Sequence, residues 1–264
     1  MWSCSGSSLS DWQRPRQYRN STAQDRDQKG EILQRIGRTA AYLFAVSLFG
    51  ATLWYALIIN DITVQGPAPA EPGQSFAAVL DDFFAYLIPT LMQERLAILL
   101  GLVAFVALGT FALALRSLIT AHMGVLVMLG LELGSALWII ANLIQLGGHR
   151  AIEVMIQNGR DPEVVHPVFI AVEFVDDWLE FAGYLLIGLA MVTLGVAADG
   201  DLSAAWRRSS IIIGTVVFTL AISLGFELGD MVDPLLLATG AVLVPGWAVW
   251  TARLLPDPDL ARSD

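Results

Sequence analysis

The stretch LAILLGLVAFVALGTFALAL, residues 96–115, holds twenty consecutive residues without a charged side chain. A membrane-spanning helix needs about 20 mostly apolar residues, because roughly 30 Å of hydrocarbon is crossed at about 1.5 Å per residue. Residues 96–115 meet this requirement. The sequence therefore predicts a transmembrane helix here, and the same test applies to the rest of the chain.

Five further stretches pass the test, over about residues 40–59, 119–146, 168–198, 211–226 and 235–252. Two of them contain acidic residues: Glu132 lies inside 119–146, and the first half of 168–198 is acidic. We therefore expect an all-α polytopic membrane protein with six transmembrane helices in one bundle over residues 31–255. Residues 1–30 and 256–264 are expected to form tails, the first of them disordered.

The composition agrees with a membrane location. The chain has 264 residues, of which 55% are hydrophobic and 15% charged, and its mean hydropathy is +0.61. Soluble domains carry about a quarter charged residues, so the lipid bilayer is the expected solvent. The formal net charge of −10 and the lack of a basic stripe argue against nucleic-acid binding. The single cysteine, Cys4, excludes an intrachain disulfide and a cysteine-based metal centre.

The distribution of basic residues predicts the orientation. If the N-terminus is inside, twelve of the fifteen Lys and Arg residues fall on the inner side, and only Arg95, Arg150 and Arg160 fall outside. Positive residues are retained on the cytoplasmic side of a membrane. An even number of helices places both termini on one side, so both are expected to be cytoplasmic, with an acidic outer face. The expected location is the plasma (inner) membrane, crossed several times.

The first outer loop contains an amphipathic segment over about residues 76–91. Apolar residues recur there with a spacing near 3.6, after a linker rich in Pro and Gly. This spacing predicts an interfacial helix. A lid packed on the bundle is favoured over a gate, because amphipathic spacing reports only one wet face and one dry face.

Glu132 is the clearest ionisable group inside a predicted span. A charge in the bilayer costs several kcal/mol unless it is paired, protonated or facing water. Ser135, Asn142, Gln145 and His149 follow Glu132 on one broad face of the same helix and form a polar stripe that should face the bundle interior. Two interpretations remain open: interhelical hydrogen bonds around a protonated Glu132, or a lined cavity or proton path.

A second group of acidic residues begins the fourth predicted helix. At about 100° per residue, its four carboxylates project within an arc of roughly 100°. Such a cluster must share protons, bind a cation or stand in water. It is either a solvated helix extension or an outward-facing acidic vestibule that concentrates cations or a cationic ligand. The candidate residues are Glu173, Asp176, Asp177 and Glu180, with Tyr184 one turn deeper and Glu227 and Asp230 at the outer end of the next helices.

A divalent-metal site is a further hypothesis. His149 and Glu153 are four residues apart, as are Glu173 and Asp177, and two such pairs facing each other would suit zinc or another divalent ion. The chain has no His-Glu-x-x-His motif and no phosphate-binding loop, so no cofactor is predicted beyond this possible cation.

Small residues mark two sites of close helix contact. Gly130-Leu131-Glu132-Leu133-Gly134 and Gly225-Phe226-Glu227-Leu228-Gly229 each place glycines four residues apart, which lets two helix backbones approach closely. Such faces could also dock another membrane protein or a second copy of the chain.

The layout resembles a known group of proteins. A polar tail, six helices, one acid inside the third helix and the closing run Val244-Pro245-Gly246-Trp247-Ala248-Val249-Trp250 are similar to small six-helix membrane proteins of unknown function in high-GC bacteria. The resemblance implies the fold and a bacterial inner membrane, and no activity. From the residues we expect a non-enzymatic cation or small-solute transporter-like protein or a sensor, with Glu132 as a buried titratable group. The alternatives are a structural or regulatory membrane partner, and a metal-dependent hydrolase at the outer rim.

Overall fold

The computed structural model describes residues 14–63, 74–119, 121–198, 202–226 and 228–255. These residues form helices and no β-strand, apart from an isolated bridge between Ile119 and Ala198. The elements are α1 (Arg14–Thr63), α2 (Phe76–Leu115), η2 (Arg116–Leu118), α3 (Ala121–Gln157), α4 (Pro162–Ala197), α5 (Ala204–Gly225), α6 (Gly229–Leu237), η3 (Ala238–Leu243) and α7 (Val244–Leu254).

Six helical segments in the described part of the chain are long and apolar enough to cross a membrane. They are Gly30–Leu57, Phe76–Leu115, Met123–Gln157, Pro162–Ala197, Ala204–Gly225 and Met231–Leu254. The predicted number of spans is confirmed, and the chain has the layout of a multi-pass membrane protein.

Each span also presents a large apolar side chain to the outside of the bundle. Val46, Val106, Leu126, Val196, Ile212 and Val242 are all more than half exposed. In water such a surface would be costly, whereas in a bilayer it contacts lipid.

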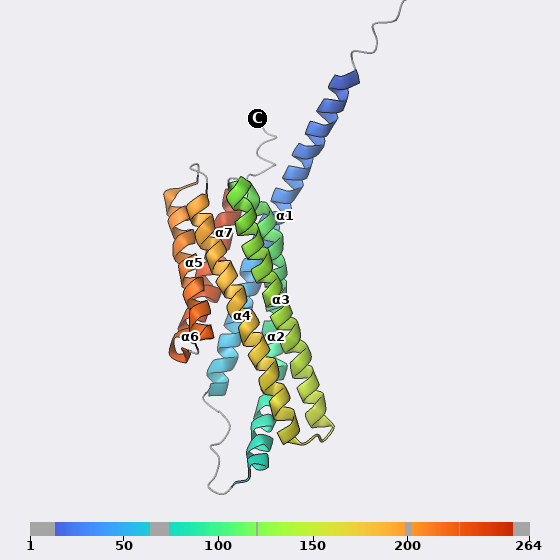
Figure 1. The fold of residues 1–264 in the computed structure, drawn as a ribbon, viewed down its shortest axis with the longest axis vertical. Coiled ribbons are helices and arrows are strands. Elements are labelled where there is room, and N and C mark those ends of the chain that lie inside the picture. Colours follow the sequence, from blue (N-terminus) through green and yellow to red (C-terminus); the bar gives the residue numbers. More distant parts are fainter. Residues whose placement is uncertain (1–13, 64–73, 120, 199–201, 227, 256–264) are drawn as a thin grey trace, which may run out of the picture.

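The start of α1 and the end of α7 lie at the same end of the bundle, which we call the terminus end (Figure 1). Consecutive helices pack on one another, and α7 packs back onto α1 and closes the bundle. We call the opposite end, which carries Glu94, Glu173 and Asp233, the acidic end.

Glycines allow the closest helix contacts. A Cβ atom on Gly214 would lie 2.8 Å from Gly188 O, so α4 and α5 touch at their backbones. On α3, a Cβ on Gly134 would lie 2.9 Å from Gly183 O of α4, and one on Gly130 would lie 2.9 Å from Ala190 Cβ. The first predicted small-residue motif is therefore used inside the chain.

The structure differs from the expected boundaries at the N-terminus and in the first outer loop. Helix α1 begins at Arg14, within the expected disordered tail, while residues 1–13 and 256–264 lie outside the described residues. Residues 76–91 do not form a separate interfacial helix, because they are the first half of the 40-residue helix α2. Ser75 caps this helix by accepting a hydrogen bond from the backbone nitrogen of Ala78 at 3.3 Å.

Other helices cover the apolar face of residues 76–91. Leu80 and Phe84 pack against Ile152 of α3 and Val165 of α4 in a small separate core. Helices α2, α3 and α4 are 36 to 40 residues long, far more than a bilayer requires, and their extra turns project together beyond the other helices (Figure 1). The amphipathic spacing reports this three-helix extension and not a membrane surface.

The sixth span changes helix type along its length. Between α6 and α7, residues Ala238–Leu243 form a π-helical segment, η3. Pro245 follows at the start of α7 and has no backbone N–H to continue the α-helical pattern. Its ring would also clash with the carbonyl of residue 241, and a wider helical turn relieves that clash.

Candidate functional site

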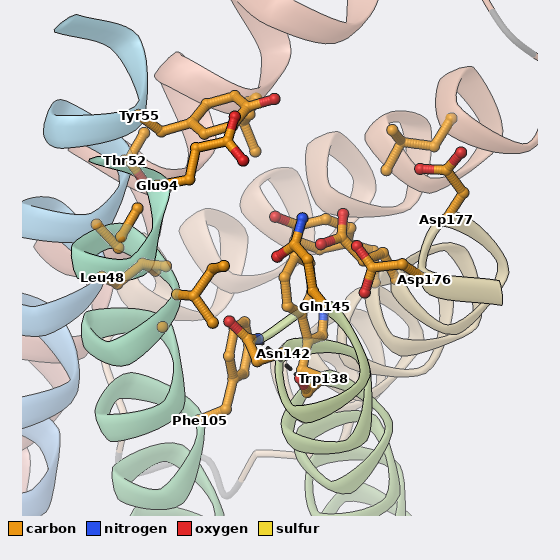
Figure 2. Close-up of a pocket in the computed structure, with 18 of the residues that line it drawn as sticks. Leu48, Thr52, Tyr55, Glu94, Phe105, Trp138, Asn142, Gln145, Asp176 and Asp177 are labelled. Atoms are coloured by element: carbon orange, nitrogen blue, oxygen red, sulfur yellow. Dashed lines mark hydrogen bonds between the residues drawn. The ribbon is translucent and has the colours of Figure 1, made fainter. Parts of the chain in front are cut away.

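A cavity of about 220 Å³ lies at the acidic end, between the spanning helices (Figure 2). Residues of α1, α2, α3, α4, α5 and α6 all line it. Because every span contributes, the cavity depends on the whole bundle.

The walls of the cavity carry six carboxylates from three helices. Four belong to α4, where they occupy one face in the way the helical spacing predicts; one comes from α2 and one from α6. These residues are Glu173, Asp176, Asp177 and Glu180, together with Glu94 and Asp233. No Lys, Arg or His is among the described residues that line the cavity. Clefts lined by one sign of charge raise the local concentration of the opposite ion.

Asp176 has the least exposed side chain of these six acids. It is only 4% exposed, and its Oδ1 atom is buried without a hydrogen-bond partner among the described residues. Figure 2 shows its side chain directed from α4 toward the middle of the cavity. An unsatisfied buried polar atom costs about 1–3 kcal/mol, and more when it is charged. Asp176 thus offers an acceptor that no described residue uses.

Aromatic rings form the deep part of the cavity. Phe105 of α2 stacks on Trp138 of α3, with ring centroids 4.6 Å apart and an interplanar angle of 11°. Tyr184 of α4 meets Trp138 edge-on, with centroids 4.7 Å apart at 74°. All three side chains line the cavity. We call them the aromatic floor.

Amide side chains lie between the floor and the acids. Asn142 is buried and donates from Nδ2 to Trp138 O at 2.8 Å, and Gln145 lines the cavity one turn further along α3. Gly101 of α2 leaves room for Asn142, because a Cβ there would lie 2.9 Å from Asn142 Oδ1.

Helix α1 forms the remaining wall. Leu48, Thr52 and Tyr55 line the cavity from this side, and Tyr55 is partly exposed at its mouth. Thr52 is buried against the π-helical segment, where a Cβ on Gly240 would lie 2.2 Å from Thr52 Oγ1. The irregular part of the sixth span is therefore in direct contact with a residue of the cavity wall.

The structure separates Glu132 from this site. Glu132 is partly exposed and does not line the cavity, and its neighbours Leu129 and Leu133 are exposed on the outside of the bundle. Ser135 is buried, but its hydroxyl donates to Leu131 O at 2.6 Å within the same helix. Of the predicted polar stripe, only Asn142 and Gln145 reach the cavity.

The four residues predicted to bind a metal also divide. His149 is buried, and its Nε2 lies 2.9 Å from Glu173 Oε1, while its Nδ1 lies 3.9 Å from Glu94 Oε2. Glu153 instead pairs with Arg95 and with Arg150, the latter through an Nη1 to Oε2 distance of 2.7 Å. Within the described ranges, no three His, Cys, Asp or Glu side chains gather as a metal ion requires. Glu227 and the side chain of Asp230 lie outside the described residues.

Sequence reasoning included Tyr184 but missed Glu94, Tyr55, Phe105 and Trp138 as site residues. A signal for Glu94 was present: Glu94, Ile98, Gly101 and Phe105 recur at helical spacing and share one face of α2. Dividing α2 into an interfacial helix over about residues 76–91 and a span beginning at Leu96 concealed that face.

Comparison of the chain with family models, with curated proteins and with solved structures finds no match. The resemblance to six-helix proteins of high-GC bacteria therefore rests on layout alone, and the case for a function depends on the cavity.

Proposed function

We propose that this protein is a non-enzymatic, cation-binding membrane protein, transporter-like or a sensor, whose binding site is the acidic cavity. One observation carries the proposal: six carboxylates of α2, α4 and α6 surround one cavity that has no basic residue among its described lining. Carboxylates held together need a counter-charge, protons or water. A bound cation meets that need, and it gives the unpaired Asp176 Oδ1 a partner.

The proposed orientation places the cavity on the outer face of a bacterial inner membrane. Arg35, Arg116, Arg207 and Arg253 flank the terminus end, which the positive-inside tendency assigns to the cytoplasm. The acidic end then faces the outside of the cell, and the cavity is open to cations from that side.

The π-helical segment of the sixth span adds support for a functional role of the cavity. π-Helical turns are rare inside α-helices and occur frequently at functional sites. Here η3 adjoins Leu236 of the cavity wall and contacts Thr52.

The two other functions considered from the sequence have less support. A docking role for Gly130 and Gly134 competes with their contact with α4. A metal-dependent hydrolase would need Glu153 as a ligand, and that carboxylate already pairs with two arginines.

The test is cation binding by the purified full-length protein in detergent, measured by the shift in unfolding temperature and by calorimetry at constant ionic strength. The chlorides of potassium, magnesium and tetramethylammonium serve as probes. At least one cation should stabilise the wild type, since a ligand that binds only the folded state raises its stability. Asp176→Asn should abolish the shift, and the matched control Glu132→Gln should retain it. The proposal is overturned if no probe binds, or if Asp176→Asn binds as the wild type does.

A further inference from the structure

The cavity changes character with depth. Along α4, the lining residues run from Glu173 through Asp176 and Glu180 to Tyr184, which spans about 16 Å at the standard helical rise. Along α2 the corresponding line runs from Glu94 to Phe105. Both helices therefore carry carboxylates at the mouth and an aromatic ring at the deep end.

The third and first helices repeat this gradient. On α3 the lining runs from Gln145 through Asn142 to Trp138, and on α1 it runs from Tyr55 to Leu48. Polar groups thus occupy the outer and middle levels, and apolar or aromatic groups occupy the floor. A ligand that is complementary to the acidic, polar and aromatic parts of the cavity carries a positive charge and also has apolar surface.

An inorganic ion does not match the floor. A metal ion is held by oxygen, nitrogen or sulfur ligands at short distance, which the faces of aromatic rings do not provide. An alkylammonium ion gains from both parts of the site, because its charge is attracted to carboxylates and to the faces of aromatic rings, while its methyl or methylene groups are buried.

The volume limits the ligand to a small one. At about 220 Å³, the cavity is smaller than the roughly 300 Å³ at which sites for drug-sized molecules begin. Asp176 supplies a second observation beyond the clustering of the acids, because it is 4% exposed and its Oδ1 lacks a partner among the described residues while its side chain lines the cavity.

We infer that the ligand of this cavity is a small organic ammonium ion, held between the carboxylates at Asp176 and Glu180 and the aromatic floor of Phe105, Trp138 and Tyr184. This inference rests on the proposed cation-binding function and names the class of cation. The charged group lies at the level of the acids, and its alkyl groups face the rings.

The test compares choline with its neutral carbon isostere, in which a tert-butyl group replaces the trimethylammonium group. Calorimetry on the full-length protein in detergent should detect choline and tetramethylammonium, but not the isostere. Tyr184→Leu should weaken choline binding about fivefold to tenfold, the size expected for the loss of one cation–π contact in a partly dry site. Tyr184→Phe keeps the ring and should retain most of the affinity.

The outcomes separate this inference from the proposed function. If potassium or magnesium binds in a manner that depends on Asp176 while neither ammonium probe binds, the ligand class is wrong and cation binding stands. If no cation binds, both proposals fail. Equal choline affinity in the wild type and in Tyr184→Leu overturns the role of the aromatic floor. Phe105→Leu provides a second variant if Tyr184→Leu does not fold, and an unfolding temperature without ligand identifies that case.

Discussion

The two ends of the bundle treat buried polar groups in opposite ways. At the terminus end, Trp206 and Trp247 are buried, and each indole nitrogen has a hydroxyl partner. Trp206 Nε1 donates to Thr251 Oγ1 at 3.0 Å, and Trp247 Nε1 donates to Ser210 Oγ at 2.9 Å. The two hydroxyls donate in turn to the backbone carbonyls of Trp247 and Trp206, at 2.7 and 3.1 Å. We call these four residues the tryptophan network.

At the acidic end, several buried polar atoms have no such partner. Asp176 Oδ1, Trp138 Nε1 and His149 Nδ1 lack a hydrogen bond among the described residues. A satisfied polar network rigidifies a core, whereas unsatisfied buried groups cost free energy and call for another explanation. The tryptophan network at the terminus end is satisfied, whereas the acidic end has buried polar atoms without a hydrogen-bond partner among the described residues.

The largest expected effect tests the structural role of the terminus end. Trp247→Ala should lower the free energy of unfolding by about 3–5 kcal/mol, because it removes a fully buried ring and leaves a cavity. Unfolding in detergent, followed by temperature or by titration with denaturing detergent, measures the loss. Trp250→Ala is the control, since Trp250 is 38% exposed and should matter little. Equal losses in the two variants would remove the special role of the tryptophan network.

A second variant tests the contact between the cavity wall and η3. Gly240→Ala should cost about 1–3 kcal/mol, because the added methyl group overlaps Thr52 Oγ1. Thr52→Ala should relieve part of that cost, so the double variant should be more stable than the two single changes predict together. A double-mutant cycle of unfolding temperatures gives this coupling. If the stability losses of the two single variants simply add in the double variant, residues 52 and 240 are not in energetic contact.

The acidic end should respond to a substitution in the opposite direction from the terminus end. Without ligand, Asp176→Asn should raise the stability by about 1–2 kcal/mol, because it removes a buried carboxylate from a cluster of six acids. The same variant should lose cation binding, so its unfolding temperature should no longer respond to added cations. A destabilised Asp176→Asn protein would mean that Asp176 belongs to a structural network, as Ser210 does.

A prediction of the same size concerns one hydroxyl of the tryptophan network. Ser210→Ala should lower stability by about 1–2 kcal/mol, since Trp247 Nε1 loses its acceptor while remaining buried. Ser209→Ala, at the neighbouring and less buried position, is the matched control. Unfolding temperatures compare the two variants. If they behave alike, the contrast between the two ends does not rest on hydrogen-bond satisfaction.

Much of the fold could be predicted from the sequence. Six apolar stretches predicted six spans, and the helical spacing of Glu173, Asp176, Asp177 and Glu180 predicted that they share one face of a helix. Both are local properties, because transfer into lipid depends on the composition of about 20 residues and the side-chain direction depends on the pitch of one helix.

The sequence predicted that Glu132 faces the bundle interior and did not indicate Glu94 as a site residue. In the structure, Glu94 lines the cavity and Glu132 does not. Position along a span could be predicted for Glu132, but the rotation of its helix could not. That rotation is set by close packing of Gly130 and Gly134 on α4, a contact between two helices that the pattern of α3 alone does not reveal.

The sequence by itself determined the number of spans, the apolar outer surface and the separation of basic from acidic flanks. Only the tertiary structure decided which acids meet, that α2 to α4 extend together beyond the other helices, and that aromatic rings close the cavity below the carboxylates. The physical reason is that solvation acts on each segment alone, whereas a binding site depends on the rotation and offset of several helices, which their mutual packing sets.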